Sequence, residues 1–148
     1  MSETVAVDLD RVLGDTRPLW DAFLADAARR FATIASLDPA SIPEDRAAAS
    51  SVLDAWAAGG VGDWRRALTR FAEDHAPVHL RPDPAVNAAL RALRRRGTRV
   101  VVVTDAPAEL ADVALAHLGL ARAVDEVVPR PGPAHVVEDV GELQRMAG

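Results

Sequence analysis

Two aspartates one residue apart are the residues of this chain best suited to chemistry. Asp8 and Asp10 follow directly on the short apolar run of residues 5–7. Carboxylates this close raise each other's pKa, so a fold that keeps both at one place usually supplies a cation or lets the pair share a proton. The spacing therefore indicates a catalytic or cation-binding site, although two turn aspartates after a strand would leave the same pattern.

A second polar pair, Thr104 and Asp105, ends another apolar run at residues 99–103. Both runs are uninterrupted and rich in β-branched residues, which is typical of strands buried on both faces. Helical patterns follow Asp83 and Pro107, and residues 124–128 resemble a third strand. Strands alternating with helices predict a parallel sheet, whose ligands bind at the carboxyl ends of the strands. We expect residues 5–7 in the sheet interior and all four polar residues at one edge.

Residues 15–80 differ in character from the rest of the chain. They are rich in alanine, with helical spacing in a first helix that runs to Ile34, a second helix over residues 44–58 and a third after Asp63. All six aromatic residues lie here, between Trp20 and Phe71. We predict a separate helical cap with its own core over the carboxyl edge of the sheet. The segments 1–14 and 81–148 then form the core domain, and His75 and His79 fall in the exit loop.

Composition excludes several classes of protein. The chain has 148 residues, which suits one domain, and its net charge of -5 argues against nucleic-acid binding. The exception, Arg94 to Arg96, is explained by a helix end, where cations favour the dipole. No cysteine is present, so disulfides and thiolate sites are excluded. There is no basic leader and no apolar run of ~20 residues, so we expect a cytoplasmic protein without a membrane span.

These motifs resemble the haloacid dehalogenase-like (HAD) hydrolase superfamily, with a helical cap inserted after the first motif. The resemblance covers residues ~4–130, and its motifs here are VAVDLDRVLGDT and VVVVTD. It implies an α/β fold, a Rossmann-like parallel sheet flanked by helices with an inserted all-helical cap. It also implies that Asp8 is a nucleophile that forms an aspartyl-phosphate and that Asp10 is the general acid and base. Thr104 and Asp105 would bind the substrate phosphate, unless Thr104 only caps the helix that follows.

The C-terminal part departs from the family pattern. Arg130, in RPGP, stands where the family has a lysine, and it is either a phosphate ligand or an ordinary loop residue. The resemblance implies a Mg²⁺ site made by Asp8, Asp10 and a further acidic residue. Only PGPAHVV separates Arg130 from Glu138 and Asp139, which is too short for a crossover helix. Asp139 is the best remaining metal ligand, or else it caps the last helix together with Glu142.

Two functions follow from these alternatives. The first is a Mg²⁺-dependent phosphatase that acts on a small phosphorylated metabolite, supported by the Asp8–Asp10 pair. The second is a catalytically impaired HAD-like binding or regulatory protein, supported by the shortened C-terminal part. An Asp139 that only caps a helix would favour the second. A dehalogenase fits less well because halide displacement needs no proton-transfer group at Asp10. The oligomeric state stays open.

Overall fold

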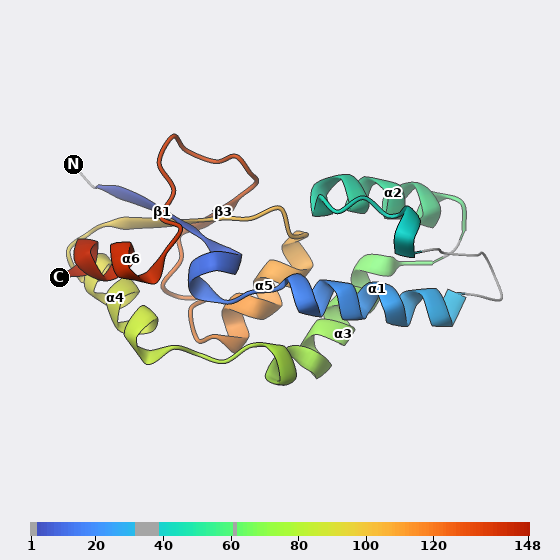
Figure 1. Cartoon of the computed structure of the whole chain (residues 1–148), viewed down its shortest axis with the longest axis horizontal. Coiled ribbons are helices and arrows are strands. Elements are labelled where there is room, and N and C mark those ends of the chain that lie inside the picture. Colours follow the sequence, from blue (N-terminus) through green and yellow to red (C-terminus); the bar gives the residue numbers. More distant parts are fainter. Residues whose placement is uncertain (1–2, 32–38, 61) are drawn as a thin grey trace.

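A computed structural model describes residues 3–31, 39–60 and 62–148, so the expected helical position Ile34 lies outside the described residues. Figure 1 shows the arrangement of the helices and strands. In chain order they are β1 (Thr4–Asp8), the π-helical turn η1 (Leu9–Leu13), α1 (Arg17–Phe31), the 3-10 turn η2 (Pro39–Ser41), α2 (Arg46–Ala58), α3 (Trp64–His79), α4 (Pro84–Arg95), β2 (Arg99–Val103), α5 (Ala108–His117), β3 (Glu126–Val128) and α6 (Val140–Ala147).

The sheet is parallel, with strand order β1-β2-β3. Val5 pairs with Val100 and Asp8 with Val103, so the two polar ends of β1 and β2 lie at the same edge. The predicted α/β fold with a parallel sheet flanked by helices is confirmed. The uninterrupted apolar runs also form buried strands, as predicted, because residues 5–8 of β1 and residues 100–103 of β2 are all buried.

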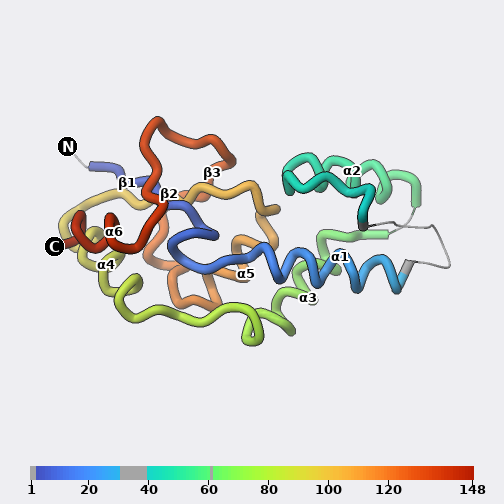
Figure 2. The backbone as a smooth tube through the Cα atoms, in the orientation of Figure 1, coloured from blue at the N-terminus to red at the C-terminus, as the bar shows by residue number. Residues whose placement is uncertain are grey.

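The predicted interior position of residues 5–7 is wrong for this three-stranded sheet, in which β1 comes first. Its outer side is covered at one point only. Val137 forms a parallel bridge with Val7, donating its N–H to the Ala6 carbonyl at 2.8 Å and accepting from the Asp8 N–H at 2.9 Å. Figure 2 shows the segment after β3 leaving the sheet and returning beside β1 before α6 begins. The shortened C-terminal part therefore supplies a single bridging residue where a strand was expected.

Helix α4 illustrates how local sequence sets an element against the sheet. Asp83 caps it by accepting from the Ala85 N–H at 2.9 Å, and Pro84 occupies the first position, where a missing N–H costs nothing. Leu90 and Leu93 are fully buried on its inner face. The helix packs against β2 and α6, and it covers the sheet on the side away from the helical insert formed by α1, α2 and α3.

Helices α1, α2 and α3 lie toward the carboxyl ends of the strands, as predicted (Figure 1). Their aromatic residues pack together, with Trp20 and Trp64 edge to face at 6.2 Å and Phe23 and Phe71 at 5.8 Å between ring centroids. These rings belong, however, to one continuous hydrophobic cluster that also contains the strands. The expectation of a separate core is therefore wrong, and the boundaries 15–80 stay a prediction.

The exit segment is also more helical than expected. His75 and His79 lie within α3, which contains Pro77 and ends where the Leu80 N–H donates to the Ala76 carbonyl at 2.8 Å. Ala76 and Leu80 are buried, so packing extends the helix through Pro77 and over the two histidines that were expected in a loop. No helix among the described residues has the length and apolar character needed to cross a bilayer.

Candidate active site at the carboxyl edge of the sheet

Asp8 is the last residue of β1 and is only 3% exposed. Its Oδ1 accepts from the Arg11 N–H at 3.0 Å, which caps the η1 turn. Its Oδ2 accepts from Nη2 of Arg130 at 2.9 Å. A buried carboxylate needs a charge partner to stay ionised, and Arg130 provides it from the loop after β3. The structure thus brings together two residues that the sequence placed 122 positions apart.

Gly132 allows the Arg130 loop to lie close to the sheet. Its φ is +70°, a backbone conformation that residues with a side chain rarely adopt. A Cβ at this position would also lie 2.8 Å from Cγ2 of Val103, the last residue of β2. The loop can therefore approach the carboxyl end of β2 only with glycine here, and this approach holds Arg130 beside Asp8.

Asp10 lies in the η1 turn, buried to 6% exposure. Its Oδ1 accepts from both the N–H and the hydroxyl of Thr16, at 2.8 Å and 2.6 Å. Its Oδ2 accepts from the guanidinium of Arg46. Both oxygens are thus fully engaged, and all of their partners are donors.

Arg46, the first residue of α2, is the central cation of the site although it is only 2% exposed. Its Nη1 donates to Oγ1 of Thr16 at 2.6 Å. Its Nε and Nη2 both donate to Oδ1 of Asp105, at 3.0 Å and 2.8 Å, and its backbone N–H donates to Oδ2 at 3.1 Å. One side chain therefore joins the helical insert to the ends of β1 and β2.

The contact with Arg46 changes the pKa of the Asp105 carboxyl. Burial alone raises the pKa of its carboxyl, but the hydrogen bonds and charge of Arg46 outweigh burial and hold the pKa below its usual range. Asp105 was predicted to bind substrate phosphate. The structure shows that its side chain anchors Arg46. Phosphate binding at Asp105 stays a prediction.

Thr104 follows β2 and is 3% exposed. Its Oγ1 accepts from the Ala106 N–H at 3.0 Å, so the hydroxyl organises the turn that leads into α5. This is close to the capping alternative, although the formal cap position of α5 is Pro107, which has no side-chain cap. Thr104 also lines a cavity of about 390 Å³ together with Asp105 and Arg130. The other polar residues of its lining are Asp45, Ser50, Arg65 and Asp112.

Asp139 does not join the site. It is exposed and caps α6, where its Oδ1 accepts from the Glu142 N–H at 2.7 Å. Its neighbour Glu138 pairs with Arg11 at 3.0 Å. The predicted metal set of Asp8, Asp10 and Asp139 is therefore not assembled, and no group of three acidic or histidine residues within 3–31, 39–60 and 62–148 is placed to hold a metal ion.

The hydrogen-bond donors around Asp8 and Asp10 explain why these carboxylates do not form the predicted metal site. The prediction assumed that Asp8 and Asp10 could stay charged together only around a shared cation. Arg130 and Arg46 supply that positive charge instead, one to each carboxylate. The carboxylate oxygens point to N–H groups and not to a common centre, so the described residues do not fit a magnesium site built on three carboxylates.

Sequence reasoning missed Thr16 and Arg46. Thr16 stood inside the quoted first motif, and its distance of six residues from Asp10 suits a turn that folds back on itself. Arg46 carried no such signal, because it is one of 17 arginines and precedes a run of alanines that reads as an ordinary helix start.

The comparisons with known proteins agree with this fold. The sequence model for haloacid dehalogenase-like hydrolases matches residues 5–145. Among solved structures, a HAD phosphatase from Thermococcus onnurineus is similar at 20% identity and a TM-score of 0.50, covering 88% of this chain and 62% of that one. An L-2-haloacid dehalogenase from Xanthobacter autotrophicus, with chloropropionic acid covalently bound, is similar at 18% identity and a TM-score of 0.44, covering 87% and 57%.

No curated protein matches this sequence. The chain spans about three fifths of the length of these two solved structures. At 20% identity, the phosphatase bears on the fold alone. The family match is of a different kind, since it extends over nearly the whole chain and includes Asp8, Asp10, Thr104 and Arg130. The chain belongs to the haloacid dehalogenase-like hydrolase family.

Proposed function

We propose that this chain is a HAD-type phosphatase that removes phosphate from a small phosphorylated metabolite through an aspartyl-phosphate on Asp8. The observation that carries the proposal is the position of Asp8 at the carboxyl end of β1, with Arg130 on one oxygen and Asp10 two residues on. Arg130 also lines the 390 Å³ cavity, so its guanidinium connects the nucleophile to a space in which a phosphate ester fits.

The proposed reaction has two steps. In the first, an Asp8 oxygen attacks phosphorus, the ester P–O bond breaks, and the leaving alkoxide takes a proton from Asp10. In the second, water attacks the phosphorus of the aspartyl-phosphate, Asp10 takes a proton from that water, and inorganic phosphate leaves with Asp8 restored. Arg130 stabilises charge on the phosphoryl oxygens in both steps.

Charge compensation by arginine is the second part of the proposal. Enzymes of this family generally use Mg²⁺, but the carboxylates here do not form a three-carboxylate site and each already has a guanidinium partner. We therefore propose that Arg130 takes over the electrostatic role beside the nucleophile. Arg46 holds Asp10 and Asp105 in place and acts as a positioning residue. No step above depends on a metal ion.

A binding or regulatory function without turnover is the second candidate. The capping role of Asp139 favours it, because the family's third acidic ligand has no counterpart at the sheet edge. The hydrogen bonding of Asp10 favours it as well, since three donors from Thr16 and Arg46 already occupy both carboxylate oxygens. We rank it second because Arg130 and Arg46 already supply the positive charge that a bound metal ion would bring to Asp8 and Asp10.

Phosphate release from a generic aryl phosphate separates these cases. The proposal predicts turnover by the wild type that persists when EDTA removes divalent cations and disappears in Asp8→Asn. Turnover that is abolished by EDTA and restored by Mg²⁺ would leave the phosphatase standing and refute the role given to Arg130. Phosphate binding without any turnover, with or without Mg²⁺, would favour the second candidate.

A further inference from the structure

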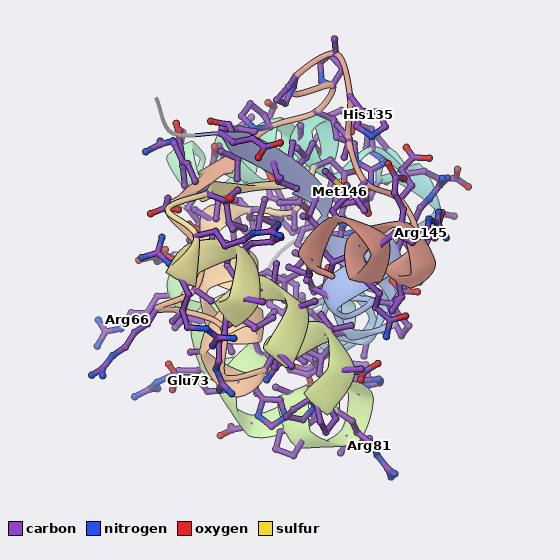
Figure 3. All side chains as sticks on the ribbon, turned by 90° about the vertical axis from the view of Figure 1, so that its left-hand side faces the viewer. Arg66, Glu73, Arg81, His135, Arg145 and Met146 are labelled. Carbon is purple, nitrogen blue, oxygen red and sulfur yellow. The ribbon has the colours of Figure 1, made fainter. Side chains whose placement is uncertain are left out.

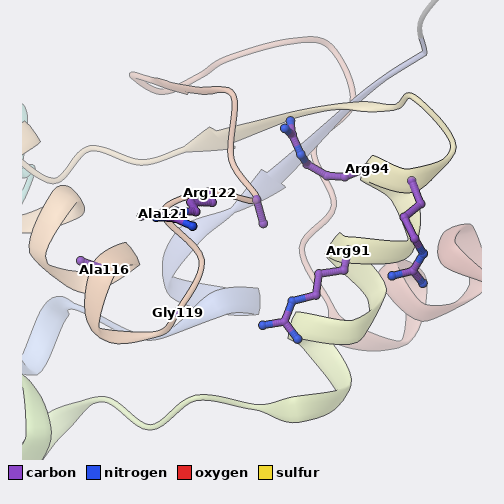
Figure 4. A pocket seen from close by; sticks show the side chains of 8 residues that line it. Arg91, Arg94, Ala116, Gly119, Ala121 and Arg122 are labelled. Carbon is purple, nitrogen blue, oxygen red and sulfur yellow. The ribbon is translucent and has the colours of Figure 1, made fainter.

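A second cavity lies at the opposite edge of the sheet from Asp8. It has a volume of about 560 Å³ and lies between the C-terminal half of α4, which leads into the start of β2, and the turn after α5, which leads into β3. Its lining consists of four arginines and four small residues: Arg91, Arg94, Arg95, Arg122, Ala116, Gly119, Ala121 and Ala123. Figure 4 shows Arg91 and Arg94 reaching from α4, with Arg122 on the segment after α5.

The charge of this pocket contrasts with that of the chain. The net charge is -5, yet no acidic residue lines the pocket. Arg94 is paired with Asp125, just outside the lining. The side chains of Arg91, Arg95 and Arg122 form no hydrogen bond or ion pair within the part of the chain that the structure describes. Three uncompensated guanidinium groups therefore surround one hollow.

The helix dipole accounts for only part of this cluster. Arg94 and Arg95 lie in the last turn of α4, where cations interact favourably with the helix end. Arg91 lies one turn earlier, and Arg122 belongs to a different segment beyond α5. Cations from two segments that meet at one cavity repel each other unless an anion lies between them. The cluster thus indicates a ligand and not only a solvated helix terminus.

The lining also defines the chemistry of that ligand. Guanidinium groups bind phosphate through paired N–H donors, and several of them suit more than one phosphate group. The alanine and glycine residues make the rest of the lining small and apolar, which suits contact with a ring, and the volume lies in the range of small-molecule sites. We propose that this pocket binds a small organic polyphosphate of the nucleoside diphosphate class. This site is independent of the proposed phosphatase reaction.

Titration calorimetry with ADP tests the proposal. We would use the Arg130→Gln background, so that the anion site at the carboxyl edge cannot contribute. We expect one site per chain, weakened by added salt, with binding order ADP over pyrophosphate and ADP over AMP. In Arg91→Gln/Arg122→Gln the affinity should fall by roughly 100-fold, about tenfold for each lost charged contact.

Arg81→Gln is the matched control, because Arg81 is exposed, lies outside the pocket lining and projects away from the fold (Figure 3). It removes one positive charge, as each of the two pocket substitutions does, and should leave ADP affinity within about twofold, a difference of less than 0.5 kcal/mol. Unchanged thermal unfolding would show that the pocket variants fold, and Arg91→Lys/Arg122→Lys should bind with intermediate affinity. The proposal is overturned by no ADP binding, by AMP or pyrophosphate binding as tightly as ADP, or by equal losses in the pocket and control variants.

Discussion

Replacing Arg46 by methionine should destabilise the protein more than any exposed ion-pair substitution. Arg46 has a side-chain exposure of 3% and holds Asp10, at 1%, and Asp105, at 19%. Removing one partner of a buried ion pair leaves an uncompensated charge and typically costs about 3–5 kcal/mol. Asp10 keeps its two bonds from Thr16 and Asp105 is partly exposed, so we expect the lower end, about 3 kcal/mol.

Urea unfolding at pH 7, followed by tryptophan fluorescence and by circular dichroism, measures this loss. The matched control is Arg65→Met, since Arg65 also joins the helical insert to the core by pairing with Asp54 and Glu109, but it is 37% exposed. Each of these two exposed ion pairs should contribute about 0–1 kcal/mol to the unfolding free energy. The triple variant Arg46→Met/Asp10→Asn/Asp105→Asn should recover most of the loss, because the amides carry no charge.

The pH dependence provides a further check. The pKa of Asp105 lies below its ordinary value of 3.8 because Arg46 outweighs the opposing effect of burial, so the pair stabilises the wild type above that pH and the contribution is lost as the pH falls through the lower folded value. Without the Arg46 guanidinium, only the backbone N–H of residue 46 and the charge of Arg130 oppose burial, so the pKa of Asp105 rises. The deficit of Arg46→Met should then be largest at neutral pH and shrink below pH ~4. A loss equal to that of Arg65→Met, or no recovery in the triple variant, would contradict this reasoning.

The remaining predictions concern the candidate site and its supports. Asp8→Asn should abolish phosphate release with the fold intact, and Asp10→Asn should slow it roughly 10²–10⁴-fold, both measured by steady-state kinetics. Asp139→Ala should lower the unfolding free energy by about 1 kcal/mol through loss of the α6 cap and leave phosphate release unchanged; a large kinetic loss would restore Asp139 as a ligand. Gly132→Ala should cost about 1–3 kcal/mol and raise KM, because the loop carrying Arg130 must move away from Val103.

Local patterns in the sequence predict most of the fold. The uninterrupted valine-rich runs identify β1 and β2, and Asp63 and Asp83 cap the helices that they were expected to cap. The loop expected at His75 and His79 is wrong, because α3 continues through Pro77 where Ala76 and Leu80 are buried, and no local pattern reveals that burial. The interior position predicted for residues 5–7 is wrong for a related reason, since only one bridging residue, Val137, lies beside β1.

The candidate site shows where sequence reasoning ends. Asp8 and Arg130 meet because each lies at or just after the carboxyl end of a strand whose position the α/β pattern fixes, and phosphate binding by Arg130 stays a prediction. Arg46 depends on how α2 is oriented over the sheet, and that orientation comes from tertiary packing between distant segments. Asp139 does not take the predicted place as a metal ligand, because its carboxylate caps its own helix α6. A cap between residues so close in sequence costs little chain entropy.

The most direct test of the account is to identify the phosphorylated residue. Wild-type protein mixed with an activated aryl phosphate in EDTA, quenched in acid and analysed by mass spectrometry, should carry one hydroxylamine-sensitive phosphoryl group on Asp8. Asp8→Asn should carry none and should release no phosphate. Phosphate release that continues undiminished in Asp8→Asn, or a phosphoryl group on a residue other than Asp8, would contradict the central claim.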